Sequence, residues 1–167
     1  MKTKNVALTA IFSALYATLV IGFAPLSYGP LQLRIADILI PLTLSFGWPV
    51  VLGASIGCFI GNIYGQLGVM DYFLGPLANL LAGTVVYLLR RRPLLASSLG
   101  AFPIGLIVGS YLWTFFPPPE ILALPEWLAM IVSITLSTLI VMGFLGYALY
   151  KSINRMFGIN HLQYEAS

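Results

Sequence analysis

The sequence predicts an all-α integral membrane protein, built as a single membrane domain over residues 1–167. Three observations support this fold class: 59% of the residues are hydrophobic, only 8% are charged, and the mean hydropathy is +0.95. Soluble domains carry about a quarter charged residues, so a chain this apolar belongs in a lipid bilayer. The first apolar segment is too long for a signal-peptide core and is followed by Pro25, which indicates a retained span.

Apolar runs bounded by proline, glycine or charge predict six transmembrane helices. The spans are expected near residues 6–24, 35–46, 49–64, 72–89, 94–116 and 127–150. Four reach the length of about 20 residues that crosses the hydrocarbon core, whereas the second and third are shorter. The sequence at Gly47, Trp48 and Pro49 argues against one continuous helix over residues 35–64, so we expect two short helices there. A re-entrant hairpin would give the same loop parity and stays open as an alternative.

The charged residues divide between the two sides of this topology. With six spans and both termini cytoplasmic, nearly all cations fall inside, as the positive-inside tendency expects. These are Lys2, Lys4, Arg90, Arg91, Arg92, Lys151 and Arg155. Arg34 alone falls outside, together with four carboxylates at the outer ends of spans, which are Asp37, Asp71, Glu120 and Glu126.

A glycine repeat organises the centre of the chain. Every fourth residue is a glycine at Gly53, Gly57, Gly61 and Gly65, and the next predicted helix repeats this step at Gly75, Asn79 and Gly83. Small residues on one helix face allow close backbone approach in lipid, so the two helices should pack tightly. The glycines need no other role. Asn62 and Asn79 differ, because an amide within a membrane must find partners or face a polar cavity.

Arg34 and Asp37 enter the second span three residues apart, which places them on one helix face. Two interpretations stay open. The pair forms a structural ion pair at the helix start, where an acidic residue is favoured by the helix dipole, or both side chains point into an outward-facing pocket. For Trp113 the alternative to a binding role is the interfacial aromatic belt. For Glu126 the alternative is a solvated loop.

Several kinds of chemistry have no residues to support them. Lysine occurs only at positions 2, 4 and 151, none after a glycine-rich turn, so the chain has no phosphate-cradling loop for ATP. The single histidine, His161, lies in the carboxyl-terminal tail, and the single cysteine is Cys58. We therefore expect no catalytic residues, no metal site and no cofactor. The pattern describes a substrate-binding subunit that lacks its motor.

The segment from Leu31 to Gly83 resembles a known family. Its signature is "LQLRIAD" before the short second helix, then a glycine helix ending in "GNIYG", then "GVMDYFLGPLANLLAG". This resembles the QueT family of queuosine-precursor transporters, which are substrate-binding S components of energy-coupling factor (ECF) transporters. In QueT-like sequences the position of Asp37 is often Glu, a departure that keeps the carboxylate and shortens its reach.

The resemblance implies an S component that captures a 7-deazaguanine such as preQ1, preQ0 or queuine from outside. Uptake would require a membrane T component and two cytoplasmic ATPases, with the S component toppling in the membrane to release its cargo. It also implies that Ala10 and Ala14, four residues apart on the first helix, contact the T component. An S component for another vitamin-like micronutrient, a stand-alone membrane enzyme and an assembly protein remain the alternatives.

The resemblance suggests a site model in which the candidate substrate-binding residues are Arg34, Asp37, Asn62, Asp71, Asn79, Trp113 and Glu126. A carboxylate, Asp71 or Asp37, would accept two hydrogen bonds from the donor edge of the base. The amides of Asn62 and Asn79 offer both donors and acceptors to its other edges. Trp113 or an outer-loop tyrosine would stack on the ring.

Overall fold

The computed structural model describes residues 3–28, 33–117 and 124–157, and the elements within these ranges are all helices. They are α1 (Thr3–Gly22), α2 (Ala24–Ser27), η1 (Ile35–Leu42), α3 (Thr43–Phe46), α4 (Trp48–Gly65), α5 (Val69–Leu88), α6 (Pro93–Leu99), α7 (Ala101–Leu112), α8 (Glu126–Thr138), η2 (Leu139–Gly146) and α9 (Tyr147–Phe157). The predicted all-helical class is confirmed. Glu120 and His161 lie outside the described residues.

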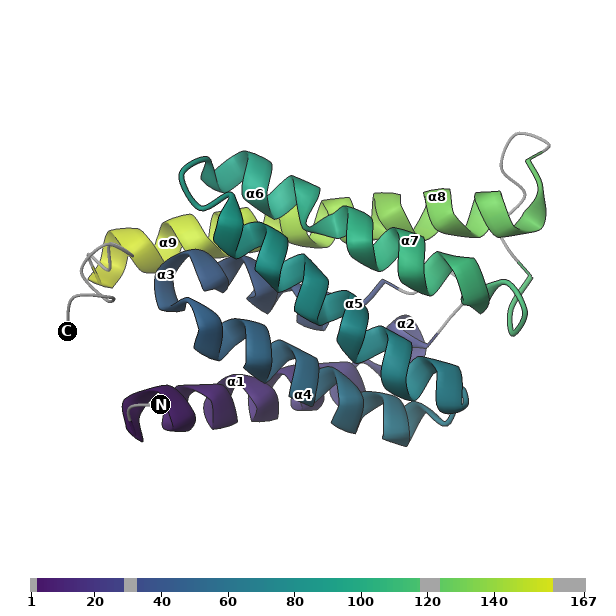
Figure 1. The fold of residues 1–167 in the computed structure, drawn as a ribbon, viewed down its shortest axis with the longest axis horizontal. Coiled ribbons are helices and arrows are strands. Elements are labelled where there is room, and N and C mark those ends of the chain that lie inside the picture. The colour runs from purple at the N-terminus through teal and green to yellow at the C-terminus, as the bar shows by residue number, and fades with distance from the viewer. Residues whose placement is uncertain (1–2, 29–32, 118–123, 158–167) are drawn as a thin grey trace.

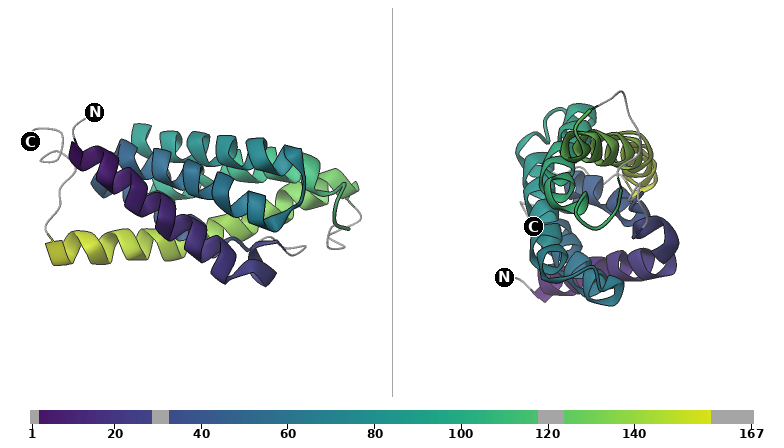
Figure 2. Two further views of the ribbon diagram at one scale, coloured as in Figure 1. Left: turned by 90° about the horizontal axis from the view of Figure 1, so that it is seen from below. Right: turned by 90° about the vertical axis from the view of Figure 1, so that its right-hand side faces the viewer.

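The long helices run side by side as an elongated bundle (Figures 1 and 2). The start of α1 and the end of α9 lie at the same end of this bundle, and so does the turn between α5 and α6 (Figure 1). Helix α1 packs on α4, α4 packs on α5, and α7 packs on both α5 and α8. The η1 segment contacts α1, α4, α5 and η2, so it lies inside the bundle.

Five helical stretches of the described chain are long and apolar enough to cross a membrane. They are Thr3–Gly22, Trp48–Gly65, Val69–Leu88, Pro93–Leu112 and Glu126–Met156. The sixth predicted span, Ile35–Phe46, is a shorter apolar helix. Its first part is a 3₁₀ helix that contains Pro41, and twelve residues at a rise of about 1.5–2.0 Å reach less than the roughly 30 Å of a hydrocarbon core. Six full spans are therefore not confirmed.

The predicted break between the second and third segments is confirmed at Gly47. Its backbone has φ 66° and ψ −144°, a conformation that glycine adopts without the steric cost of a Cβ atom. Helix α4 then begins with Trp48 and Pro49, and proline is tolerated in a first turn because its missing N–H would have no helical partner there. With these residues included, α4 has 18 residues and is longer than expected.

Glycines of α4 lie directly against α1. A Cβ atom on Gly53 would come within 2.7 Å of the Phe12 Cβ, and one on Gly57 within 2.6 Å of the Ser13 carbonyl oxygen. On the other side, a Cβ on Gly83 of α5 would lie 3.0 Å from Val51. The predicted tight packing of α4 and α5 is present, but the repeated glycines of α4 itself serve the contact with α1.

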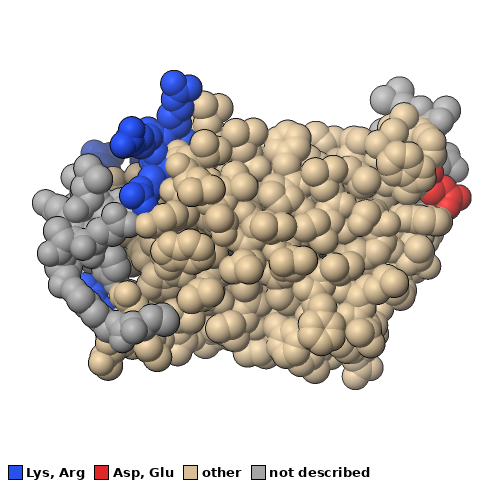
Figure 3. Space-filling model, in the orientation of Figure 1, with Lys and Arg blue, Asp and Glu red and all other residues tan. Residues whose placement is uncertain are grey.

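Charged side chains mark the two ends of the bundle (Figure 3). Lys and Arg gather at the end that holds the start of α1 and the end of α9, and a carboxylate lies at the opposite end. The exposed cations there are Lys4, Arg91, Arg92, Lys151 and Arg155, and Glu126 is exposed at the start of α8. The side surface between the two ends is uncharged in this view, as a lipid-facing surface requires.

Candidate functional site

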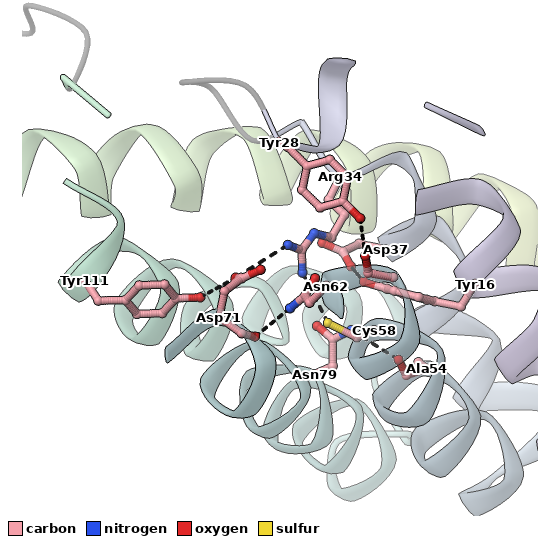
Figure 4. Close-up of polar contacts among 11 residues, drawn as sticks. Tyr16, Tyr28, Arg34, Asp37, Ala54, Cys58, Asn62, Asp71, Asn79 and Tyr111 are labelled. Atoms are coloured by element: carbon pink, nitrogen blue, oxygen red, sulfur yellow. Dashed lines mark hydrogen bonds and ion pairs between the residues drawn. The ribbon is translucent and has the colours of Figure 1, made fainter. Parts of the chain in front are cut away.

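Polar side chains from five elements converge inside the bundle (Figure 4). We call this set the buried polar cluster. It comprises Tyr16 of α1, Arg34 before η1, Asp37 of η1, Cys58 and Asn62 of α4, Asp71 and Asn79 of α5, and Tyr111 of α7. All eight side chains are buried. Buried charges are costly unless they are paired and hydrogen-bonded, so the partners of each group decide what the cluster can do.

Arg34 lies at the centre of the cluster. Its Nη1 donates to the Cys58 Sγ at 3.2 Å, and its Nη2 lies 4.0 Å from the Asp71 Oδ1. Neither Nε nor Nη2 has a hydrogen-bond partner, although the side chain is only 5% exposed. The ion pair therefore connects Arg34 to Asp71. The alternative of an ion pair between Arg34 and Asp37 is wrong.

Each carboxylate of the cluster accepts a tyrosine hydroxyl. Tyr16 donates to the Asp37 Oδ1 at 2.5 Å, and Tyr111 donates to the Asp71 Oδ1 at 2.7 Å. Both are short O–H···O hydrogen bonds. The second oxygen of Asp71, Oδ2, is buried and has no partner.

The two amides occupy neighbouring positions between α4 and α5. Asn62 donates from Nδ2 to the backbone oxygen of Asp71 at 2.6 Å, while its Oδ1 has no partner. Asn79 donates to the Ala54 carbonyl at 3.4 Å, which is a long and weak bond. Gly75 makes room for Asn62, because a Cβ there would lie 2.4 Å from the Asn62 Nδ2.

Tyr28 closes one side of the cluster from the segment after α2. Its hydroxyl donates to the Gly61 carbonyl, and its ring covers Gly65, where a Cβ atom would overlap the ring. Burial raises the pKa of Tyr28 to about 12, so the hydroxyl stays protonated and remains a donor. This bond ties Tyr28, at the end of α2, to α4.

Four buried polar atoms of the cluster thus lack partners: Arg34 Nε and Nη2, Asn62 Oδ1 and Asp71 Oδ2. Two are donors and two are acceptors. An unpartnered buried polar group costs about 1–3 kcal/mol, and more when it is charged. Natural proteins keep such groups where water or a ligand completes them. Within the described residues no group of three or more His, Cys, Asp or Glu side chains could hold a metal ion.

Five of the seven predicted substrate-binding residues lie in the cluster: Arg34, Asp37, Asn62, Asp71 and Asn79. Trp113 and Glu126 do not. Trp113 follows α7, is 37% exposed, and its indole N–H donates to the Ser110 carbonyl at 2.9 Å. Glu126 is exposed in the first turn of α8. These positions fit the alternatives of an interfacial aromatic residue and a solvated carboxylate.

Three members of the cluster were not among the predicted site residues: Tyr16, Cys58 and Tyr111. The sequence could have predicted Cys58 as a site residue, since it precedes Asn62 by one helical turn and therefore shares its helix face. No pattern in the sequence could have predicted the two tyrosines. Their partners lie 21 and 40 residues away in sequence, and only the packing of α1 and α7 brings them to the carboxylates.

The predicted partner-binding alanines lie on the outer surface of α1. Ala10 and Ala14 are exposed, whereas Phe12, Ser13 and Tyr16 of the same helix are buried. The small-residue pair is thus free of contacts within the subunit that would bury it.

Comparison with known proteins agrees with the sequence resemblance. Residues 6–155 match the QueT transporter family. The chain is also similar to a protein of Lactococcus lactis subsp. cremoris (strain MG1363) named "Queuosine precursor transporter QueT", with 35% identity over 81 residues. That alignment covers 47% of this chain and 47% of the relative, about half the length of each. No solved structure matches the chain. Because the family match extends from α1 to α9, this multi-pass membrane protein belongs to the QueT transporter family.

Proposed function

We propose that this protein is the substrate-binding S component of an ECF-type importer and captures a queuosine precursor, a 7-deazaguanine such as preQ1, preQ0 or queuine. One observation carries the proposal: buried donors and acceptors without partners converge from Arg34 just before η1, Asn62 of α4 and Asp71 of α5. The cost of leaving them unsatisfied is offset when a small polar molecule supplies the missing bonds. The name of the Lactococcus lactis relative supports the substrate class.

The cluster's hydrogen-bonding groups complement a deazaguanine. The ring N–H and exocyclic amine of the base form a donor edge, which the free Asp71 Oδ2 and Asn62 Oδ1 accept. The base carbonyl takes the free donors of Arg34. The ring face lies against an aromatic side chain, for which the cluster offers Tyr16 and Tyr111, and Tyr28 lies beside it. Asn79 has only a weak bond to Ala54 and is available to the remaining edge.

Transport direction follows from the charged end of the bundle. The end with Lys4, Arg91, Arg92, Lys151 and Arg155 faces the cytoplasm under the positive-inside tendency. The termini then lie inside. The cluster receives its ligand from the opposite, outer side of the membrane.

Energy for release comes from partner subunits in this proposal. The sequence has no phosphate-cradling loop, so two ATPases and a membrane T component supply the work. Ala10 and Ala14 form the contact with the T component, because exposed small residues four apart allow a second helix to approach closely.

The test is direct binding. We would purify the chain alone in detergent, identify any co-purifying ligand by mass spectrometry, and titrate the stripped protein with preQ1, preQ0, queuine and a panel of vitamins. We expect micromolar or tighter binding of at least one deazaguanine and none of the vitamins. Asp71→Asn keeps the side-chain shape and should weaken that binding by about tenfold to a hundredfold, since it removes a charged acceptor. Glu126→Gln, a carboxylate outside the cluster, is the matched control.

Two results would contradict the proposal. Binding of a vitamin in place of every deazaguanine would favour an S component for a different micronutrient. Unchanged affinity in Asp71→Asn, with the ligand still bound, would remove the cluster from the site.

A further inference from the structure

The connection between α5 and α6 carries three consecutive arginines, residues 90–92, at the cationic end of the bundle (Figure 3). We call residues 88–95 the arginine turn. Arg91 and Arg92 are exposed, and neither forms an ion pair with a described carboxylate. Those carboxylates lie elsewhere, two in the buried polar cluster and Glu126 at the opposite end of the bundle. The charges of Arg91 and Arg92 are therefore not balanced by the described part of the chain.

Two observations place the arginine turn at the level of the lipid headgroups. Helix α5 has 20 residues, which at about 1.5 Å per residue cross the roughly 30 Å hydrocarbon core and end just before the arginines. The rings of Trp48 and Tyr87 lie with their centroids 5.4 Å apart, and the Arg90 Cζ lies 4.4 Å from the Tyr87 centroid. Tryptophan and tyrosine concentrate at the interface between membrane and water, so these rings mark the same depth.

Apolar side chains border the arginines on both sides. The exposed leucines of the turn are Leu88, Leu89, Leu94 and Leu95. In a membrane these side chains meet acyl chains, while long arginine side chains extend to the phosphate level. A surface with cations beside lipid-facing leucines complements an anionic phospholipid, which joins a phosphate to apolar acyl chains.

Two other exposed cations at this end, Lys151 and Arg155 of α9, lie farther out. The apolar helix from Glu126 to Met156 has 31 residues, roughly 46 Å at 1.5 Å per residue, which is longer than the hydrocarbon core. Figure 1 shows the end of α9 reaching past the turn between α5 and α6 along the long axis of the bundle. These two cations provide a comparison of equal charge at a different depth.

We propose that the arginine turn is a binding site for an anionic phospholipid, such as phosphatidylglycerol, in the leaflet around this end of the bundle. Arg91 and Arg92 bind the phosphate through charge-assisted hydrogen bonds, and the exposed leucines contact the acyl chains. Trp48 and Tyr87 lie beside the headgroup, with Arg90 over the Tyr87 ring. This site does not depend on the ligand of the buried polar cluster.

The test uses Trp48 as a local reporter. The chain has three tryptophans, so Trp113→Phe and Trp127→Phe together leave Trp48 alone, and this full-length variant is the reference protein. In vesicles of phosphatidylcholine and phosphatidylglycerol, one lipid at a time is brominated near its headgroup, and quenching of Trp48 gives the relative association constant of the two lipids. We expect phosphatidylglycerol to be favoured about thirtyfold, the contribution of two arginines near a membrane surface.

Matched variants separate a local site from general attraction. Arg91→Gln with Arg92→Gln should lower the preference to about fivefold or less, since one arginine of the turn remains. Arg91→Lys with Arg92→Lys keeps both charges and should retain most of the preference. Lys151→Gln with Arg155→Gln removes the same charge from α9 and should stay within about threefold of the reference protein. Soluble glycerol 3-phosphate has no acyl chains and should leave the quenching unchanged.

Four results would overturn the proposal. Equal quenching by the two brominated lipids in the reference protein would leave the arginines to an acidic protein surface. Equal losses in the two glutamine double variants would replace the site by diffuse attraction to the whole cationic end. Relief of quenching by glycerol 3-phosphate would assign the arginines to a soluble phosphate compound. A preference that persists without Arg91 and Arg92 would place the lipid elsewhere. If that variant does not fold, the reference protein and the lysine variant decide.

Discussion

Two faces of α4 do different work. One face consists of Gly53, Gly57 and Gly61 and lies in direct contact with α1. The other presents Cys58 and Asn62, which meet Arg34 and the backbone of Asp71. Both faces are buried, and the sequence marks both with the same four-residue step. The first face brings the backbones of α4 and α1 close together. The second carries polar side chains, and one of their atoms, the Asn62 Oδ1, has no hydrogen-bond partner.

The comparison separates residues that hold the fold from residues that are available to a ligand. Burial alone cannot do this, because Gly57 and Asn62 are both buried. The two residues differ in what surrounds them. Gly57 packs against α1 with no room for a further atom, whereas the Asn62 Oδ1 has no hydrogen-bond partner. Substitutions on the first face should therefore damage stability, and those on the second should damage binding.

Gly57→Ala should break the first face most severely. The added Cβ would lie 2.6 Å from the Ser13 carbonyl oxygen and 2.7 Å from the Tyr16 Cβ, both on α1, so the helices must separate. Overpacking of this kind costs about 1–3 kcal/mol, which corresponds to a fall of roughly 2–12 °C in the melting temperature of a chain of this size. Thermal unfolding in detergent, followed by size-exclusion fluorescence, would measure it.

Gly22→Ala is the matched control, since a Cβ at Gly22 of α1 would have nothing within 4 Å. Its melting temperature should stay the same or rise slightly, because alanine favours the helix over glycine by about 0.5–1 kcal/mol. Equal losses in the two variants would show that the α1–α4 contact is not the reason for the glycine.

Arg34→Met should break the second face most severely. It removes the guanidinium and leaves Asp37 and Asp71 buried without a cation, and loss of one partner from a buried pair costs about 3–5 kcal/mol. We expect ligand binding to fall at least a hundredfold, with reduced stability. Arg34→Lys keeps the charge but loses the planar fork, so it should fold normally and bind about tenfold more weakly. Titration and melting of both variants would distinguish the two effects, and full binding by Arg34→Met would exclude Arg34 from the site.

The order of these effects also shows what sequence reasoning can reach. Local patterns predicted the helices, the break at Gly47 and the polar residues on the inner faces of η1, α4 and α5. Local patterns could not predict contacts between segments that lie far apart in the sequence. Tyr111 reaches Asp71 across 40 residues, and no periodicity near Tyr111 distinguishes it from an interfacial tyrosine.

The sixth span illustrates a second limit. Residues 35–46 are apolar throughout, and hydropathy cannot tell a short buried helix from a short membrane crossing. The 3₁₀ geometry around Pro41 and the contacts with α1, α4 and α5 place this segment inside the bundle. Burial among other helices also explains why it can carry Asp37.

Asn79→Leu tests the α5 side of the buried polar cluster. Its bond to Ala54 is 3.4 Å long and contributes little to the fold, so membrane expression should be unchanged. If Asn79 contacts the ligand, its replacement leaves a polar edge of the base unpaired, and binding should become undetectable at ordinary protein concentrations. Expression level and calorimetric titration would be measured together. Retained affinity would remove Asn79 from the site and limit the ligand to the region around Arg34, Asn62 and Asp71.

Trp113→Phe should have the smallest effect, and it sharpens the comparison because Trp113 belongs to neither face of α4. The indole is 37% exposed and its N–H bond goes to Ser110 of its own helix, so the substitution leaves the cluster untouched. Phenylalanine keeps an aromatic ring at the same depth. We expect deazaguanine affinity within about twofold of the native value, since surface substitutions away from buried networks stay within about 0.5 kcal/mol. A tenfold loss in the same titration would mean that the ligand-bound protein brings Trp113 to the base, and that the site extends beyond the cluster toward the end of α7.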